Sequence, residues 1–226
     1  MLLNPGPTAS SSSCISNNTK LNCVLLNSRS LCNKIVEFQG LVYGNNLDVV
    51  TVTETWLHDG YFDGEVLSSS LYTVFRKDRG GNKRGGGVLL AVKTDLLAHR
   101  RPDLEPPNSE IFVCDFVSPN SFKITFCLCY RPPNCSLFMD YFECLLVNLS
   151  ETTGRICIVG DFTDMPTIDW EYVIVLSNST DGVKFCNLIN SHFLTQVVKE
   201  PTRISHSAKT VLDLVFYNYP EEIFED

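Results

Sequence analysis

The sequence predicts an α/β protein in which a β-sandwich carries helices on its outer faces. From Leu21 onward, short apolar runs rich in β-branched residues alternate with polar or helical connections, as in a mixed α/β domain. Strand-like runs dominate the middle of the chain, between residues 72 and 130. This distribution favours packed sheets over a single doubly wound sheet.

The folded part opens with a predicted β-α-β unit. Residues 21–26 (LNCVLL) and 48–53 (DVVTVT) are apolar runs that predict strands, and residues 31–42 between them predict a helix. The further predicted strands are residues 72–75, 87–92, 111–116, 122–130, 156–159 and 212–216. The further predicted helices are residues 137–149 and 182–189.

The length of 226 residues fits one domain with a substantial core. Residues 1–19 are rich in Ser, Asn, Pro and Thr and have little to bury, so we expect a flexible leader there. The folded domain is expected over residues 20–226. An apolar content of 44% and a charged content of 19% are typical of a folded protein.

The distribution of charge says more than its sum. A net charge of −8 argues against a general nucleic-acid coat protein, because phosphate binding needs local positive potential. It does not exclude a nuclease, whose metal site is itself a cluster of carboxylates. Residues 76–84 form a positive island that is either a DNA-binding loop beside the site or a solvated hairpin tip. Its basic residues are Arg76, Lys77, Arg79, Lys83 and Arg84.

Ten cysteines raise the possibility of disulfides or a zinc site, but the sequence has no CxxC pair. Cys127 and Cys129 lie two residues apart in an apolar run, where a strand would point both to one face. We therefore expect free, mostly buried thiols and a reducing compartment, the nucleus or the cytoplasm. The sequence shows no signal peptide and no apolar run long enough to span a bilayer, so a secreted or membrane protein is not expected.

Four predicted strands begin or end at a polar or acidic residue. Asn27, Glu54 and Asp161 follow apolar runs, and Asp213 enters the last one. Each has an ordinary structural explanation, such as capping a helix or ending a strand. Together they predict a metal-binding cleft, because strand ends are where α/β sheets place their sites and carboxylates bind hard cations.

Seven short motifs lie along the chain in one order. They are LLNSRSL, TETWL, FRKDRGGNKRGGGVLLAV, YRPPN, IVGDFTDMPTIDW, PTR and LDLVF. This ordered set resembles the endonuclease domain of non-LTR (LINE-type) retrotransposons, which belong to the endonuclease/exonuclease/phosphatase superfamily with DNase I and the apurinic/apyrimidinic endonucleases. The resemblance runs from about Leu21 to the end of the chain.

The resemblance implies a DNase I-like α/β/β/α sandwich of four layers, which hydrolyses DNA phosphodiesters with Mg²⁺ or Mn²⁺. By motif, Glu54 is the principal metal ligand and Asn27 supports the metal site. Tyr130 hydrogen-bonds the scissile phosphate, and Asp161 orients or deprotonates the attacking water. Asp213 holds a catalytic histidine in its tautomer.

Two departures from the family pattern bear on activity. The position after the GDF motif is normally Asn, and here it is Thr163, which offers a shorter side chain with a single donor. The family's closing Ser-Asp-His segment, which supplies the histidine and the last strand, does not follow LDLVF before residue 226, so we expect a C-terminally truncated domain. The four histidines present lie outside such a motif; they are His58, His99, His192 and His206.

Three functions remain open at this point. The first is a metal-dependent endonuclease that nicks target DNA for target-primed reverse transcription, with a reverse transcriptase and the element RNA as partners in a complete element. The second is an inactive relic that keeps the fold and DNA binding. The third is a lipid or nucleotide phosphatase of the same superfamily, against which the glycine-rich basic segment and the YRPP motif argue.

Overall fold

The computed structural model describes residues 20–80, 85–117, 122–163, 165, 168–170, 172–177, 179–204 and 209–222. The leader expected over residues 1–19 lies outside them, as do Lys83, Arg84 and His206. Two sheets dominate the described part of the chain.

The first sheet contains the predicted β-α-β unit. Its strand order is β1-β2-β4-β3, in which β1 and β2 are parallel and are joined by helix α1 (Ile35–Gly44). β2 and β3 both pair antiparallel with β4. The strands are β1 (Cys23–Asn27), β2 (Val49–Thr53), β3 (Tyr72–Lys77) and β4 (Val88–Lys93).

The second sheet has the strand order β11-β14-β8-β7-β6-β5. Its one parallel pair is β7–β8, and helix α3 (Phe138–Leu149) makes the crossover between them. The strands are β5 (His99–Arg100), β6 (Ile111–Val117), β7 (Lys123–Tyr130), β8 (Arg155–Asp161), β11 (Thr195–Gln196) and β14 (Asp213–Tyr217).

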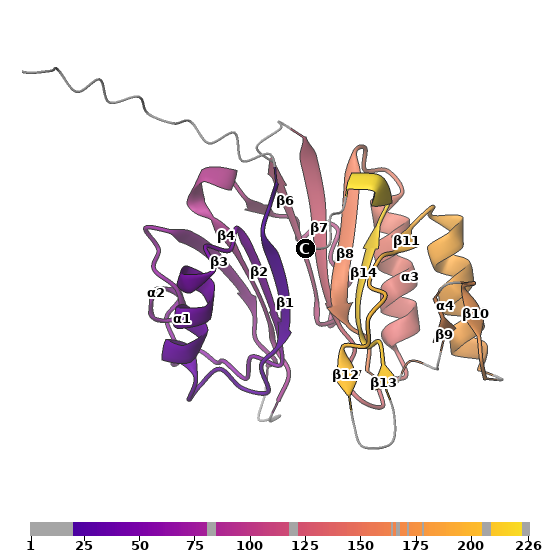
Figure 1. The fold of residues 1–226 in the computed structure, drawn as a ribbon, viewed down its shortest axis with the longest axis horizontal. Helices are drawn as coiled ribbons and strands as arrows, with labels where there is room; N and C mark the ends of the chain where they lie inside the picture. The colour runs from indigo at the N-terminus through magenta and orange to yellow at the C-terminus, as the bar shows by residue number, and fades with distance from the viewer. Residues whose placement is uncertain are drawn as a thin grey trace, which may run out of the picture.

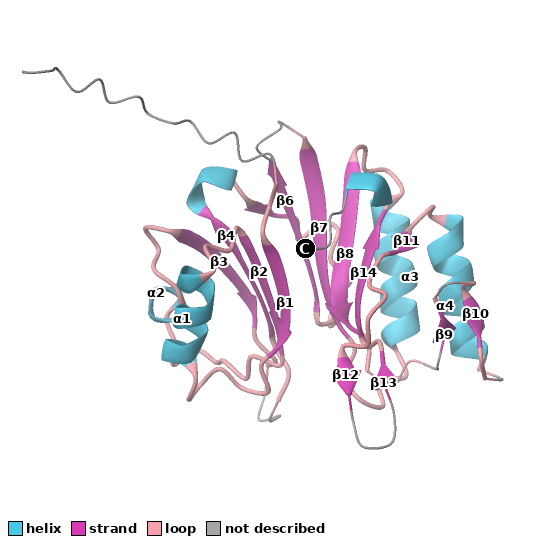
Figure 2. Cartoon of the chain, in the orientation of Figure 1, coloured by secondary structure: helices cyan, strands magenta, loops and turns pink. Residues whose placement is uncertain are grey.

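The two sheets pack face to face between outer helices, with α1 on one side and α3 and α4 (Thr180–Ser191) on the other (Figure 1; Figure 2). Three hydrophobic clusters fill the three interfaces between these layers. Leu90 and Leu128 pack between the sheets, while Leu89 faces α1 and Cys127 faces α3. The four-layered DNase I-like sandwich is therefore confirmed, and strands buried on both faces explain the near-continuous apolar runs.

All eight predicted strands and all three predicted helices are present, with shifted ends. The elements that were not predicted are a four-residue helix, two three-residue 3₁₀ helices and six two-residue strands, which are too short to show a hydrophobic period. They are α2 (Asp63–Val66), η1 (Thr94–Leu96), η2 (Pro220–Glu222), β5, β9 (Ile168–Asp169), β10 (Ile174–Val175), β11, β12 (Arg203–Ile204) and β13 (Lys209–Thr210).

The nine cysteines of the described residues are all free, as expected. Four of them are buried: Cys114, Cys127, Cys129 and Cys186. Among the described helices, none combines the length and the apolar character that a membrane span requires.

Candidate active site

Four strand ends bring polar side chains together at one end of the sandwich. Asn27 ends β1 and pairs in register with Thr53, directly before Glu54. In the second sheet, Tyr130 at the end of β7 pairs with Asp161 at the end of β8. The carboxyl ends of β1 and β8 lie at the lower end of the molecule in Figure 1.

Hydrogen bonds join these side chains across the two sheets. The Asn27 amide nitrogen (Nδ2) donates to Oε1 of Glu54 at 3.0 Å and to Oδ2 of Asp161 at 2.6 Å. Oδ1 of Asn27 accepts from the backbone N–H of Arg29 at 3.1 Å, which fixes the amide with its nitrogen toward the carboxylates. The Tyr130 hydroxyl donates to Oε1 of Glu54 at 3.1 Å. The structure thus brings together four of the predicted site residues.

Glu54 adopts an unusual backbone conformation. Its φ of +53° lies in the left-handed region, which costs a residue with a side chain about 1 to 3 kcal/mol. Its carbonyl accepts from the backbone N–H of Ser30 at 2.8 Å and from the hydroxyl of Ser28 at 2.9 Å. These contacts bend the chain out of β2 and hold Glu54 beside the second sheet.

Asp161 is buried, with 3% of its surface exposed, and both contacts of its Oδ1 come from Thr163. The backbone N–H of Thr163 donates at 3.1 Å and its hydroxyl at 2.6 Å. Gly160 permits the approach of β8 to β7, because a Cβ there would lie 2.1 Å from the carbonyl oxygen of Cys129. Thr163 therefore orients Asp161.

Two further groups near the carboxylates have raised pKa values. Burial raises the pKa of Tyr130 above its ordinary value, and the negative charge of Glu54 adds to the shift, so Tyr130 is a neutral hydrogen-bond donor. Asp213 faces Asp161 across the β14–β8 pair. Burial raises the pKa of Asp213; a hydrogen bond with Thr202 opposes this shift, and the charge of Asp161 reinforces it.

The interactions found for the three described histidines are with residues other than Asp213. His58 contacts Asp59 and Tyr61. His192, which directly follows α4, hydrogen-bonds the Leu188 carbonyl of that helix. His99 pairs with Asp115 at the edge strand β5. The interactions found for Asp213 come from Thr202 and Asp161, and the role predicted for Asp213 toward a histidine stays a prediction.

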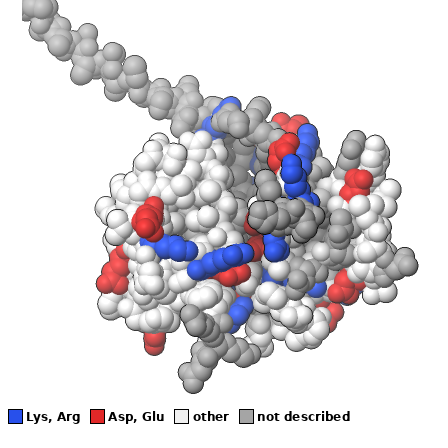
Figure 3. All heavy atoms as spheres, turned by 60° about the horizontal axis from the view of Figure 1, so that its bottom comes forward, with Lys and Arg blue, Asp and Glu red and all other residues white. Residues whose placement is uncertain are grey.

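The described members of the positive island are paired within the protein. Arg76 contacts Asp63 and Asp78, and Lys77 contacts Glu105. Figure 3, which turns the lower end of the molecule forward, shows acidic and basic side chains interspersed on the described surface.

Arg79 is the third described member of the island, and it lies nearest the site. Its guanidinium pairs with Glu110 and lies 5.9 Å from the centroid of the Tyr130 ring. A cavity of about 570 Å³ opens beside it, with Lys77, Tyr130 and Tyr141 in its wall. Sequence reasoning missed Glu110, which stands in a polar stretch without a motif, and it assigned no role to Thr202, although Thr202 lies in the PTR motif.

The donor atoms of the site suit a hard divalent cation. Two carboxylates, Glu54 and Asp161, face each other across the Asn27 amide. Mg²⁺ is typically held by one or two carboxylates together with water and substrate phosphate. The described residues contain no group of three or more His, Cys, Asp or Glu side chains placed to hold one ion. Glu54 is the residue whose carboxylate would hold the ion, and Asn27, whose nitrogen donates to Glu54 and Asp161, would support the site.

Comparisons with known proteins agree with this architecture. Residues 124–224 match the model of the family described as "Endonuclease-reverse transcriptase". The endonuclease domain of TRAS1, a telomere-specific non-LTR retrotransposon, superposes with a TM-score of 0.65 at 14% identity, over 87% of this chain and 83% of that one. Over residues 124–224 the chain is therefore similar to that family, and over most of its length it shares the fold of the retrotransposon endonuclease domain.

Other solved structures share the fold of this domain. An AP endonuclease from Archaeoglobus fulgidus has a TM-score of 0.61 at 14% identity, over 89% of this chain and 88% of that one. The 3′-5′ exonuclease NExo from Neisseria meningitidis has a TM-score of 0.63 at 16% identity, over 86% of each chain. No curated protein sequence matches the domain.

Proposed function

We propose that this chain is a metal-dependent endonuclease that hydrolyses DNA phosphodiesters, and that it nicks target DNA for target-primed reverse transcription. The observation that carries the proposal is the meeting of Asn27, Glu54, Tyr130 and Asp161 from four strand ends of two sheets. The match of residues 124–224 to an endonuclease–reverse transcriptase family favours this substrate class over others of the superfamily. In this proposal the partners are DNA, a reverse transcriptase and the element RNA, and the compartment is the nucleus or the cytoplasm.

The chemistry follows from the protonation and placement of each group. Tyr130 is a neutral phenol that donates to Glu54 at 3.1 Å in the substrate-free chain, and it transfers this hydrogen bond to a phosphate oxygen when DNA is bound. Asp161, oriented by Thr163, accepts a proton from the attacking water. Asn27 keeps the two carboxylates at a fixed separation. When bound at Glu54, with Asn27 supporting that carboxylate, Mg²⁺ or Mn²⁺ would supply positive charge for the non-bridging oxygens of the phosphate.

The test is nicking of supercoiled plasmid by the purified chain. We expect conversion to the open circle with Mg²⁺, loss of conversion with a chelator, and loss in Glu54→Gln. Glu143→Gln is the matched control, because Glu143 is a half-exposed acid that pairs with Lys184 on the outer helices. Release of phosphate from small phosphoesters without nicking would instead favour a phosphatase.

A second candidate is a domain that keeps the fold without cutting DNA. It is favoured by Thr163, whose hydroxyl donates to Asp161 and so is not free for the phosphate. If this contact limits activity, Thr163→Asn raises the nicking rate about tenfold, since one donor aimed at the reacting group is worth that much or more. A lower rate in Thr163→Asn would contradict this assignment.

A further inference from the structure

The bend before β6 places one acid, Glu110, against three segments that surround the site. Its carboxylate accepts two hydrogen bonds from the Arg79 guanidinium, at 2.8 and 2.7 Å, and one from the backbone N–H of Gly87 at 3.0 Å. Its backbone carbonyl accepts from the N–H of Tyr130 at 3.0 Å. Only 12% of the Glu110 side chain is exposed, so these bonds are shielded from water.

Gly85, Gly86 and Gly87, which we call the glycine segment, directly precede β4 and link Glu110 to the turn at Glu54. The carbonyls of Gly86 and Gly87 accept from the backbone N–H groups of Trp56 and Thr55, at 2.9 and 3.2 Å. These are the two residues that follow Glu54 in its left-handed conformation. Glu110 is thus one hydrogen bond away from Tyr130 and two away from the turn that holds Glu54.

Gly86 and Gly87 are required by the closeness of this packing. A Cβ on Gly86 would lie 2.2 Å from the guanidinium carbon of Arg79, and a Cβ on Gly87 would lie 2.6 Å from the Thr55 hydroxyl. Both residues have positive φ values, +74° and +83°. The guanidinium therefore occupies the space of a missing side chain, and Glu110 fixes it there with a bidentate pair.

We propose that Glu110 is a positioning residue of the active site, which acts through Arg79 and Gly87 on Glu54 and directly on Tyr130. The inference rests on the proposed nuclease function for its catalytic consequence. Within this assignment Arg79 holds the end of β3 against the site, and its positive charge lies beside the Tyr130 ring.

The chain offers a close control for Glu110. Glu105 also accepts a bidentate pair from an arginine, Arg100, at 2.9 and 2.8 Å, and a backbone N–H, that of Val113, at 3.2 Å. Its side chain is 5% exposed. Glu105 also pairs with Lys77 at 3.3 Å, and among the described residues it has no hydrogen bond to Gly85–Gly87 or Tyr130. Glu110→Gln and Glu105→Gln therefore remove similar bonds with different neighbours.

The first measurement is plasmid nicking by both variants at equal folded concentration. We expect Glu110→Gln to lower kcat by about tenfold or more with KM changed little, because small displacements of catalytic groups cost that much. Glu105→Gln should keep the wild-type kcat although its thermal stability falls by a similar amount. Equal kcat values in the two variants would overturn the inference.

The second measurement does not need activity. Trp56 lies against the glycine segment, since a Cβ on Gly85 would be 3.7 Å from its indole nitrogen. In a Trp170→Phe background Trp56 is the single tryptophan of the chain, and its emission and iodide quenching report the place of that segment. We expect both to change in Glu110→Gln and not in Glu105→Gln. If the wild type does not nick DNA, the proposed function fails, and unchanged Trp56 emission in Glu110→Gln would then overturn the positioning role as well.

Discussion

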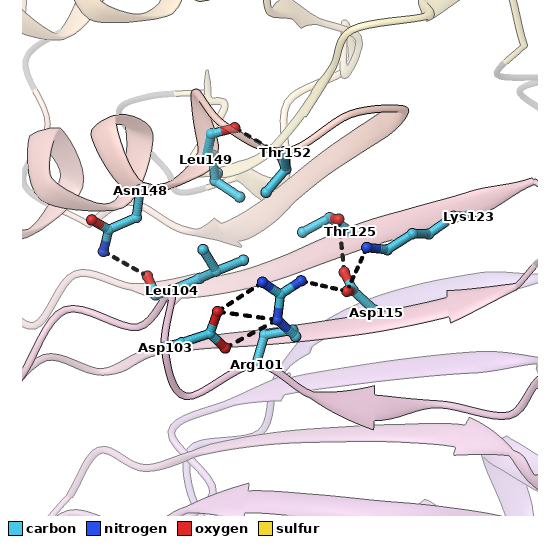
Figure 4. Close-up of polar contacts among 9 residues, drawn as sticks. All are labelled: Arg101, Asp103, Leu104, Asp115, Lys123, Thr125, Asn148, Leu149 and Thr152. Carbon is cyan, nitrogen blue, oxygen red and sulfur yellow. Dashed lines mark hydrogen bonds and ion pairs between the residues drawn. The ribbon is translucent and has the colours of Figure 1, made fainter.

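Asp115 and the pair formed by Glu54 and Asp161 differ in the groups that face their carboxylates. At the far end of β6, Asp115 accepts hydrogen bonds from Arg101 at 2.6 Å, from Lys123 at 2.9 Å and from Thr125 at 2.7 Å (Figure 4). At the strand ends, Glu54 and Asp161 receive hydrogen bonds from an amide and hydroxyl groups. Among the described residues neither forms an ion pair.

The difference teaches how a stabilising acid and a candidate catalytic acid can be told apart. Burial by itself would raise the pKa of Asp115, but the hydrogen bonds from Lys123, Thr125 and Arg101 hold it below the ordinary value. Around Asp161 no such neutralisation is found in the described chain, and the nearby Asp213 has a raised pKa. Carboxylates whose negative charge no basic side chain neutralises can bind a metal cation from solution.

The largest effect expected from this comparison is on activity. Asp161→Asn should lower the nicking rate by about 10² to 10⁴, the usual contribution of a general base. Its thermal stability should stay equal to or above that of the wild type, because a buried charge without an ionic partner is removed. A variant that loses stability and keeps its nicking rate would show that Asp161 serves the fold.

Asp115→Asn should give the opposite outcome. We expect a loss of about 1.5 to 3 kcal/mol in the free energy of unfolding at neutral pH, since hydrogen bonds to charged partners are removed, with an unchanged nicking rate. The depressed pKa of Asp115 stabilises the fold above the ordinary aspartate value of about 4 and is lost as the pH falls through its folded value. The difference between wild type and variant should therefore shrink below about pH 4, as denaturant titrations at several pH values would show.

The convergent carboxylates could be predicted from the sequence because each follows a long apolar run. Asn27, Glu54 and Asp161 end strands whose carboxyl ends meet, so their nearness follows from the order of the elements. The left-handed backbone at Glu54 has no such signal, since it depends on hydrogen bonds with residues 28–30.

The partners of the basic segment could not be predicted. Lys77 and Arg79 meet Glu105 and Glu110, which stand 28 and 31 residues further along the chain in a polar connection without periodicity. In the sequence alone, a run of basic residues suggests a surface that is free to bind DNA. The fold instead brings an acid to each of these two cations, and their predicted contact with DNA stays a prediction.

The smallest effect expected concerns Asp213, the acid that faces Asp161. Because its folded pKa is raised, the folded protein holds the Asp213 proton more tightly than the unfolded chain does, and the ionised form destabilises the fold as the pH rises above the folded value. Asp213→Asn should therefore stabilise the protein at pH 8 by less than about 1 kcal/mol, and this gain should fade toward pH 4. Unfolding free energies of wild type and variant across that range measure it. A gain of the same size at every pH would point to packing rather than charge, and a loss at pH 8 would mean that a cation already neutralises this end of the sandwich.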